Sequence, residues 1–285
     1  MSLCTVCQSE STKWIFASRG YDISRCQRCG HVYVSSSLSA GELRAAYSDA
    51  YFHTGKEAAL TGYQDYLGDA LKRMAGFRQR LEHIRPHLPK PGRLLDYGCA
   101  VGLFVKVAID SGWDATGYER SEWAVRYGKE TLGLPIIQGE GHEPSLFERE
   151  FDVVTMWDVL EHLERPREVL SSIALWLKPG GLLALNTVNC SSLGARLAGE
   201  HWRHLAPPHH LQYFSRASLT RLIEDCGFKP ISVRSTGVMI RADHRKTELS
   251  RSAAIVESLC THWRTTRLAT WLNLRDEVEM LALRS

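Results

Sequence analysis

Four cysteines near the start of the chain have the spacing of a structural metal site. They follow the pattern C-x2-C-x18-C-x2-C and are Cys4, Cys7, Cys26 and Cys29. Four thiolates complete a tetrahedral shell around zinc, so the ion would have a structural role. A segment this short cannot build a sufficient core of its own, and metal binding would supply the missing free energy of folding. We therefore predict a zinc-ribbon-like segment over residues 1–36, in which His31 could replace one cysteine. The alternative is a loose arm with unliganded thiols.

A histidine-rich loop over residues 200–215 carries side chains suited to proton transfer. It reads Glu-His-Trp-Arg-His-Leu-Ala-Pro-Pro-His-His-Leu-Gln-Tyr-Phe-Ser. An imidazole with its ordinary pKa of about 6.5 can accept a proton at neutral pH. His210 is the leading candidate for a general base, ahead of His204 and His209. The alternative for His210 is a structural role, in which it anchors the loop through backbone hydrogen bonds.

Asp158, Glu161 and His162 are spaced so that one helical face would carry all three. Two carboxylates would suit a hard cation such as Mg²⁺, although a nitrogen ligand is unusual for that ion. Two alternatives stay open: the residues line a cofactor pocket, or they form a polar first turn that caps a helix. His162 is also a candidate general base in a site without metal.

A turn of small residues follows an apolar run at residues 93–97. It reads Asp96-Tyr-Gly-Cys-Ala-Val-Gly102, and its small residues let a ligand approach the backbone closely. The free N–H groups at the start of the next helix favour a carboxylate or a phosphate. Glu119 lies 23 positions after Asp96, at the end of a second apolar run, where its carboxylate can accept hydrogen bonds from both hydroxyls of a ribose. The turn lacks the three glycines of a dinucleotide fingerprint, so it favours a smaller ribose-bearing cofactor. The alternative is a tightly packed turn with no ligand.

Alternating strands and helices place these residues. The apolar runs predict strands near residues 93–97, 114–119, 135–138, 151–156, 182–187 and 229–235. Helical periodicity predicts helices near residues 102–111, 121–132, 166–177 and 217–226. This alternation predicts an α/β fold with a doubly wound, mostly parallel sheet and helices on both faces. The candidate residues then lie at the carboxyl ends of the strands, where ligands bind in such folds.

The motifs together resemble the Rossmann-like class I S-adenosylmethionine (SAM) methyltransferases. The resemblance covers about residues 90–235, and rests on the turn after Asp96 and on the runs 118–121, 151–162 and 177–186. It departs at Ala100, where the family usually has glycine, and we expect only a slight effect because alanine is small. The resemblance implies SAM as the cofactor, bound by Asp96, Gly98, Ala100, Gly102, Glu119, Arg120, Trp157 and Asp158.

Helical apolar patterns over about residues 40–88 and 246–285, together with the resemblance, predict an organisation for the whole chain. We expect a helical lid over residues 37–90 and a SAM-binding core over residues 91–242, ending in an antiparallel seventh strand near 237–242. A helical C-terminal tail would follow over residues 243–285. The tail either caps the substrate side or forms the surface of a homodimer.

The histidine-rich loop resembles that of SAM methyltransferases from bacterial biosynthetic pathways, with Trp202 and His210 at the matching positions. This implies a small-molecule acceptor, with a hydroxyl of a sugar, natural product or lipid-like metabolite ahead of nitrogen or carbon. The acid-x-x-Glu-His pattern that starts at Asp158 resembles the magnesium site of ubiquinone-type O-methyltransferases. The alternative function is RNA methylation, with RNA held by the ribbon and by basic residues between 72 and 93. The Pro-Pro-aromatic motif of methylases that act on base amines is missing after Trp157, which argues against this alternative. A third reading is a scaffold that binds SAM without catalysis.

The composition is that of an ordinary globular protein. The chain has 285 residues, 44% of them hydrophobic, and its net charge of +3 is too small to argue for nucleic acid by itself. No window has the apolar length of a membrane span. The start Met-Ser-Leu-Cys is not a basic-then-apolar leader, so we expect a cytoplasmic protein. In such a chain two C-x-x-C pairs favour metal binding over disulfides.

Overall fold

The computed structural model describes residues 3–39, 41–42, 70–140, 147, 149–236, 239–241, 271–273 and 275–285. Most of the predicted lid and the first part of the predicted tail lie outside these residues. None of the helices in these ranges has the length and apolar character needed to cross a membrane.

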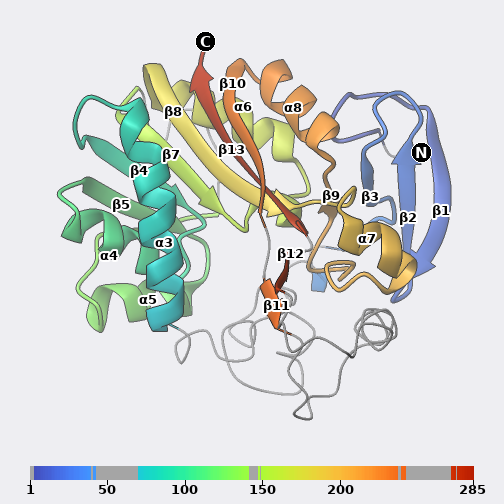
Figure 1. Cartoon of the computed structure of the whole chain (residues 1–285), viewed down its shortest axis with the longest axis horizontal. Helices are drawn as coiled ribbons and strands as arrows, with labels where there is room; N and C mark the ends of the chain where they lie inside the picture. The colour runs from blue at the N-terminus through green and yellow to red at the C-terminus, as the bar shows by residue number, and fades with distance from the viewer. Residues whose placement is uncertain are drawn as a thin grey trace.

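A seven-stranded sheet forms the centre of the molecule, in the order β10-β13-β8-β7-β4-β5-β6 (Figure 1). Its strands are β4 (Arg93–Tyr97), β5 (Asp114–Glu119), β6 (Ile136–Gln138), β7 (Phe151–Trp157), β8 (Leu177–Val188), β10 (Phe228–Thr236) and β13 (Glu277–Arg284). Strands β4 to β8 pair in parallel, whereas β13 runs antiparallel to both β8 and β10. The predicted α/β fold with a mostly parallel sheet is therefore confirmed, together with the six predicted strands.

Helices cover both faces of the sheet, as predicted (Figure 1). One face contacts α3 (Ala70–Ile84), α4 (Leu103–Asp110) and α5 (Glu122–Glu130), and the other contacts α6 (Pro166–Trp176) and α8 (Arg216–Asp225). Alternate side chains of one strand enter different parts of the core, so that Leu94 packs on the α3 side and Leu95 on the α6 side. The central strands β4, β7 and β8 are rich in buried apolar residues because both of their faces are covered.

A second sheet joins the N-terminal segment to the rest of the chain. Its strands, in order, are β1 (Thr12–Ser18), β2 (Tyr21–Cys26), β3 (Val32–Val34) and β9 (Gln212–Tyr213), and all pairs are antiparallel. We call residues 3–34 the ribbon. Because β9 belongs to the histidine-rich loop, the ribbon packs directly against that loop (Figure 1).

Short elements complete the described fold. They are the 3-10 turns η2 (Arg85–His87), η4 (Leu160–His162) and η5 (Gly199–His201), the helix α7 (Leu193–Ala198), and the strand pair β11 (Met239–Arg241) and β12 (Trp271–Asn273). Turn η4 follows β7 and carries two of the candidate site residues, Glu161 and His162.

The predicted helical tail over residues 243–285 is wrong in the part that the structure describes. Residues 271–273 form β12, and β13 is the seventh strand of the central sheet. The strand expected near 237–242 is instead β11, which pairs with β12 in a separate small sheet. Side chains of β13 enter the core on both faces of the sheet, Met280 in one part and Leu281 in the other. Residues 278–282 are therefore all buried and show no alternation of buried and exposed positions. A short run that is apolar except for Glu279 cannot be told from a buried helix by periodicity.

Two helical glycines allow a test of how closely α5 must approach the turn after β4. A Cβ at Gly128 of α5 would lie 2.9 Å from the backbone oxygen of Val101, whereas a Cβ at the exposed Gly76 of α3 would meet nothing within 4 Å. We expect Gly128→Ala to lower the free energy of unfolding by about 1–3 kcal/mol through overpacking. The control Gly76→Ala should raise it by about 0.5–1 kcal/mol, because alanine favours the helix. Urea unfolding monitored by circular dichroism measures both, and equal signs for the two variants would contradict the packing argument.

Candidate active site

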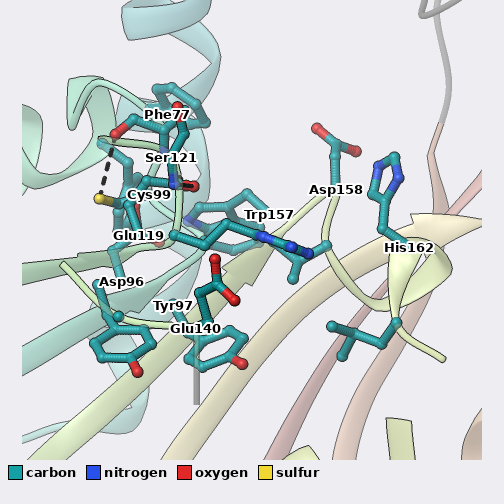
Figure 2. A pocket seen from close by; sticks show the side chains of 18 of the residues that line it. Phe77, Asp96, Tyr97, Cys99, Glu119, Ser121, Glu140, Trp157, Asp158 and His162 are labelled. Atoms are coloured by element: carbon teal, nitrogen blue, oxygen red, sulfur yellow. Dashed lines mark hydrogen bonds between the residues drawn. The ribbon is translucent and has the colours of Figure 1, made fainter. Parts of the chain in front are cut away.

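One cavity lies at the carboxyl ends of β4, β5, β6 and β7 (Figure 2). Of the predicted cofactor residues it is lined by Asp96, Gly98, Ala100, Glu119, Arg120, Trp157 and Asp158, and His162 lies beside them. Figure 2 shows Glu119 and Ser121 on one side of the cavity and Asp158 and His162 on the other. Gly102 is not part of the lining. It faces the core instead, since a Cβ added there would lie 2.8 Å from a Leu134 methyl carbon. Its contribution is close packing behind the turn.

The turn after β4 adopts a left-handed backbone at three positions. Gly98, Ala100 and Gly102 have φ angles of 74°, 51° and 86°. A Cβ at Gly98 would lie 2.6 Å from a Val159 methyl carbon, so only glycine fits there. Ala100 accepts the strained conformation, and its amide donates a 2.9 Å hydrogen bond to Glu119 Oε2. The turn and the acidic residue of β5 therefore form one unit.

Glu119 is held in place by backbone groups. Its other oxygen, Oε1, accepts a 2.8 Å hydrogen bond from the amide of Ser121, and the residue is 8% exposed. Burial raises the pKa of this carboxyl, while the amides of Ser121 and Ala100 oppose the rise. Each carboxylate oxygen has two lone pairs, so both remain able to accept a further hydrogen bond from a ligand.

Asp96 lies behind the turn and is 2% exposed. Burial raises its pKa to about 7, although the Thr155 hydroxyl donates to Oδ1 at 2.7 Å and opposes the rise. The charge of Glu119 adds to the increase. The charge of Arg80 opposes the increase without cancelling it, so the ionised form of Asp96 is unfavourable in the folded protein unless a further cation lies nearby.

The predicted helical face of Asp158, Glu161 and His162 does not form. Asp158 has a left-handed φ of 56°, and the first 3-10 residue is Leu160, so the three side chains are not stacked at helical spacing. Asp158 accepts a 2.6 Å hydrogen bond from Asn186 of β8, and Glu161 accepts one of 2.8 Å from Thr187. The two acids are thus fixed by the neighbouring strand rather than by a helix.

His162 and His210 form a pair across two loops. Their ring centroids lie 4.8 Å apart. His162 Nδ1 donates to the His209 carbonyl at 2.7 Å, and His210 Nδ1 donates to the His204 carbonyl at 2.8 Å. Each Nε2 then carries a lone pair. Burial lowers the pKa of His162 to about 4 and that of His210 well below its usual value, so both rings are neutral at neutral pH.

Sequence reasoning named Asp158 and Glu161 but missed a third acid beside them, Glu277. Burial raises the pKa of Glu161 to about 8 and that of Glu277 to about 7, and the charge of Asp158 adds to both increases. Asn186 donates to Asp158 and, at 3.3 Å, to Glu277. Glu277 was missed because it begins β13, which the sequence placed in a helical tail. An asparagine inside the apolar run of β8 was the available signal.

Three further residues of the cavity come from elements without a recognised motif. They are Arg73 and Phe77 of α3 and Glu140 after β6. The periodicity of α3 predicted its helix but not which residues of it reach the cavity. Arg80 of the same helix lies with its guanidinium carbon 4.7 Å from the Trp157 ring centroid and places a cation beside the cavity wall.

The four predicted zinc ligands converge inside the ribbon. The Sγ atoms of Cys4 and Cys29 are 3.6 Å apart and those of Cys7 and Cys26 are 3.5 Å apart, and all four lie within 4.8 Å of one another. Separations of this size fit four thiolates on one tetrahedral ion with Zn–S bonds of about 2.3 Å. His31 does not join the group, because its Nε2 donates to Gln212 at 2.9 Å.

Residues 64–233, more than half of the chain, match the family model described as a methyltransferase domain. The chain is 32% identical over 137 residues to the mitochondrial ubiquinone biosynthesis O-methyltransferase of Schizosaccharomyces pombe, a match that covers 44% of this chain and 50% of that protein. It is 25% identical over 196 residues to the ubiquinone biosynthesis O-methyltransferase of Coxiella burnetii, covering 64% of this chain and 83% of the relative. A SAM-dependent methyltransferase from Archaeoglobus fulgidus shares the fold, with a TM-score of 0.53 and 20% sequence identity. The match covers 77% of this chain and 100% of that chain.

The raised pKa of Asp96 predicts how stability depends on pH. The unfolded chain releases this proton near pH 3.8 and the folded chain near pH 7, so stability falls as pH rises through this window and is level above it. Asp96→Asn should therefore raise the free energy of unfolding at pH 8 by about 1–3 kcal/mol relative to the parent, with no gain at pH 4.

The control is Asp152→Asn, because Lys178 and the Arg93 amide lower the pKa of Asp152 against the effect of its burial. Its stability contribution is present above the unfolded pKa, so this variant should lose stability at pH 8. Urea unfolding at both pH values measures the two variants. A loss for Asp96→Asn at pH 8 would contradict the electrostatic account.

Proposed function

Because the chain belongs to the class I SAM-dependent methyltransferases, we propose that it transfers the methyl group of SAM to a hydroxyl of a small-molecule acceptor. The observation that carries the proposal is the pair of neutral imidazoles His162 and His210. His162 lines the cavity, and the His210 ring, which is not part of the lining, lies with its centroid 4.8 Å from that of His162. The relatives named as O-methyltransferases support a hydroxyl acceptor. Sugars, natural products and lipid-like metabolites are the acceptor classes that fit.

The residues of the cavity fit SAM. Glu119 would accept the ribose hydroxyls through its remaining lone pairs, and the amides of the turn at Gly98 would lie along the ligand. The indole Nε1 of Trp157 has no hydrogen-bond partner in the described part of the chain, although Trp157 is 8% exposed. A polar atom buried in this way favours a ligand that accepts from it. When bound, SAM supplies a methyl group on a positively charged sulfur.

The buried acids favour a cationic ligand. Asp96 and Glu119 line the cavity, whereas Glu161 and Glu277 lie outside its lining, and loss of solvent is the chief cause of the raised pKa of all four. A sulfonium and an ammonium group would stabilise their ionised forms. The demethylated product lacks the sulfonium, so these carboxylates would bind the donor more tightly than the product. This difference would help product release.

The histidine pair would receive the proton of the acceptor hydroxyl. The Nδ1–H groups are engaged by backbone carbonyls, which leaves Nε2 of each ring as the accepting atom. Burial makes each ring a weak base at rest, and the charge of Asp158 would stabilise the imidazolium that forms at His162. The packed loops would hold the acceptor close to the methyl group and exclude water.

A divalent cation is the alternative occupant of the same atoms. Ligand atoms of Glu161, His162 and His210 lie within 4.8 Å of one another, and Asp158 is outside this set. Two imidazoles and one carboxylate suit Zn²⁺ or Mn²⁺ better than the Mg²⁺ expected from the sequence. A metal and a base would compete for the same lone pairs. Turnover that survives chelation and is inhibited by added Zn²⁺ would favour the base.

The ribbon supports a structural zinc ion held by Cys4, Cys7, Cys26 and Cys29. Metal analysis of the purified protein should find one zinc per chain, and four reactive thiols without metal would contradict this. RNA methylation is not favoured, because the relatives are named for ubiquinone biosynthesis. The cytoplasmic location and the homodimer stay predictions.

Glu119→Gln tests the cofactor site. We expect the affinity for SAM to fall by about 10- to 100-fold, because a charged hydrogen-bond acceptor to the ribose is lost. Isothermal titration calorimetry measures this, and the control is Glu130→Gln at the exposed end of α5. Equal affinities for the two variants would contradict the assigned cofactor site.

His210→Gln and His162→Gln test the base. We expect kcat to fall by about 100- to 10,000-fold in at least one variant, while the affinity for S-adenosylhomocysteine stays unchanged. Radiolabelled methyl transfer to a panel of phenols and sugars provides the measurement. The matched control is His201→Gln, because the His201 side chain is 57% exposed in η5. Full activity in both test variants would eliminate the histidine pair as the base.

A further inference from the structure

The ribbon and the histidine-rich loop share backbone hydrogen bonds. Val32 and Tyr33 of β3 pair with Tyr213 and Gln212 of β9, and the amide of Val34 donates to the Leu211 carbonyl at 2.9 Å. The last strand of the ribbon is therefore bonded to the three residues that follow His210, which are Leu211, Gln212 and Tyr213. A separate binding module would not need to share a sheet with the loop that carries a candidate base.

Gln212 connects three segments through one side chain and is 2% exposed. Its Oε1 accepts hydrogen bonds from two ribbon residues, Thr5 Oγ1 at 2.8 Å and His31 Nε2 at 2.9 Å. Its Nε2 donates to the Leu163 carbonyl at 2.9 Å, directly after His162. The carbonyl can only accept, which fixes the orientation of the amide. All three contacts are therefore specified by one buried glutamine.

The backbone on both sides of Gln212 holds the histidine pair. The Leu211 amide donates to the Glu161 carbonyl at 2.7 Å, and the Tyr213 hydroxyl donates to the His210 carbonyl at 2.9 Å. The carbonyl that accepts the hydrogen bond from His162 Nδ1 belongs to His209, which lies three residues before Gln212. A shift of residues 209–213 would change the partners of both rings.

We propose that Gln212 is a positioning residue, through which the folded ribbon sets the orientation and tautomer of His162 and His210. The ribbon then supports the acceptor side of the site. The chemical importance of the histidine pair rests on the proposed function, but the positioning itself does not. The two can therefore fail separately.

The experiment uses the full chain labelled with ¹⁵N in its histidine side chains. Long-range ¹H–¹⁵N spectra at a fixed neutral pH report which nitrogen of each ring carries the proton, and His→Gln variants assign the signals. In the parent both rings should be Nδ1–H tautomers. Gln212→Leu should give a mixed tautomer or a changed shift for at least His162, while the affinity for S-adenosylhomocysteine stays within about twofold.

Three further variants separate positioning from general damage. Gln212→Glu still accepts from Thr5 and His31 but cannot donate to Leu163, so it should disturb His162 and leave the ribbon zinc in place. The matched control Gln27→Leu changes an exposed ribbon glutamine bonded to Ser11 and should leave both rings unchanged. If Gln212→Leu does not fold, Thr5→Val removes one of the three bonds and should shift the same signals by less.

Parent-like histidine signals in Gln212→Leu, or in Thr5→Val where Gln212→Leu does not fold, would overturn the proposal. An equal disturbance by Gln27→Leu would overturn it as well, because the effect would then not pass through Gln212. Lack of SAM binding by the parent would instead defeat the proposed function and leave the tautomer result standing.

Discussion

The burial of carboxylates at the carboxyl edge of the sheet is the constraint on which the rest of this structure depends. Asp96 and Glu161 are each 2% exposed, and Glu119 is 8% exposed. In water these groups would ionise freely, but here burial raises their pKa values and makes their charge unfavourable. The packed core on both faces of the sheet provides the free energy that tolerates this arrangement. The result is an edge of the sheet where these acids ionise more readily when a positive charge lies near them.

The same burial has the opposite consequence for the histidines. It lowers the pKa of His162 and His210 and keeps both rings neutral, so their Nε2 atoms can accept a proton or a metal. Burial therefore favours the neutral form of both the acid Glu161 and its neighbour His162. A ligand that changes the charge of the cavity would alter both sets of groups together.

Two long-range connections complete this edge of the sheet. Strand β13, from the end of the chain, lies between β8 and the edge strand β10 and brings Glu277 next to Asn186. The ribbon returns from the beginning of the chain and pairs with β9. The acceptor side is therefore built from both ends of the chain, whereas the cofactor side is built from β4, β5 and their turns. This division explains why one side was easier to predict than the other.

The sequence by itself determined the elements whose information is local. The glycine turn after Asp96, the acid at the end of β5 and the C-x-x-C pairs each lie within a short stretch, and their backbone requirements depend on near neighbours. Only the tertiary structure decided that the C-terminal residues form a strand and not a helix, because the apolar pattern of a short strand buried on both faces cannot be told from that of a buried helix. It also decided the partners of Glu161 and His210, since hydrogen bonds between distant segments leave no periodic trace in a sequence. The backbone conformation of a short segment can be inferred from its residue types. The pairing of distant segments depends instead on which surfaces of the folded chain they can cover.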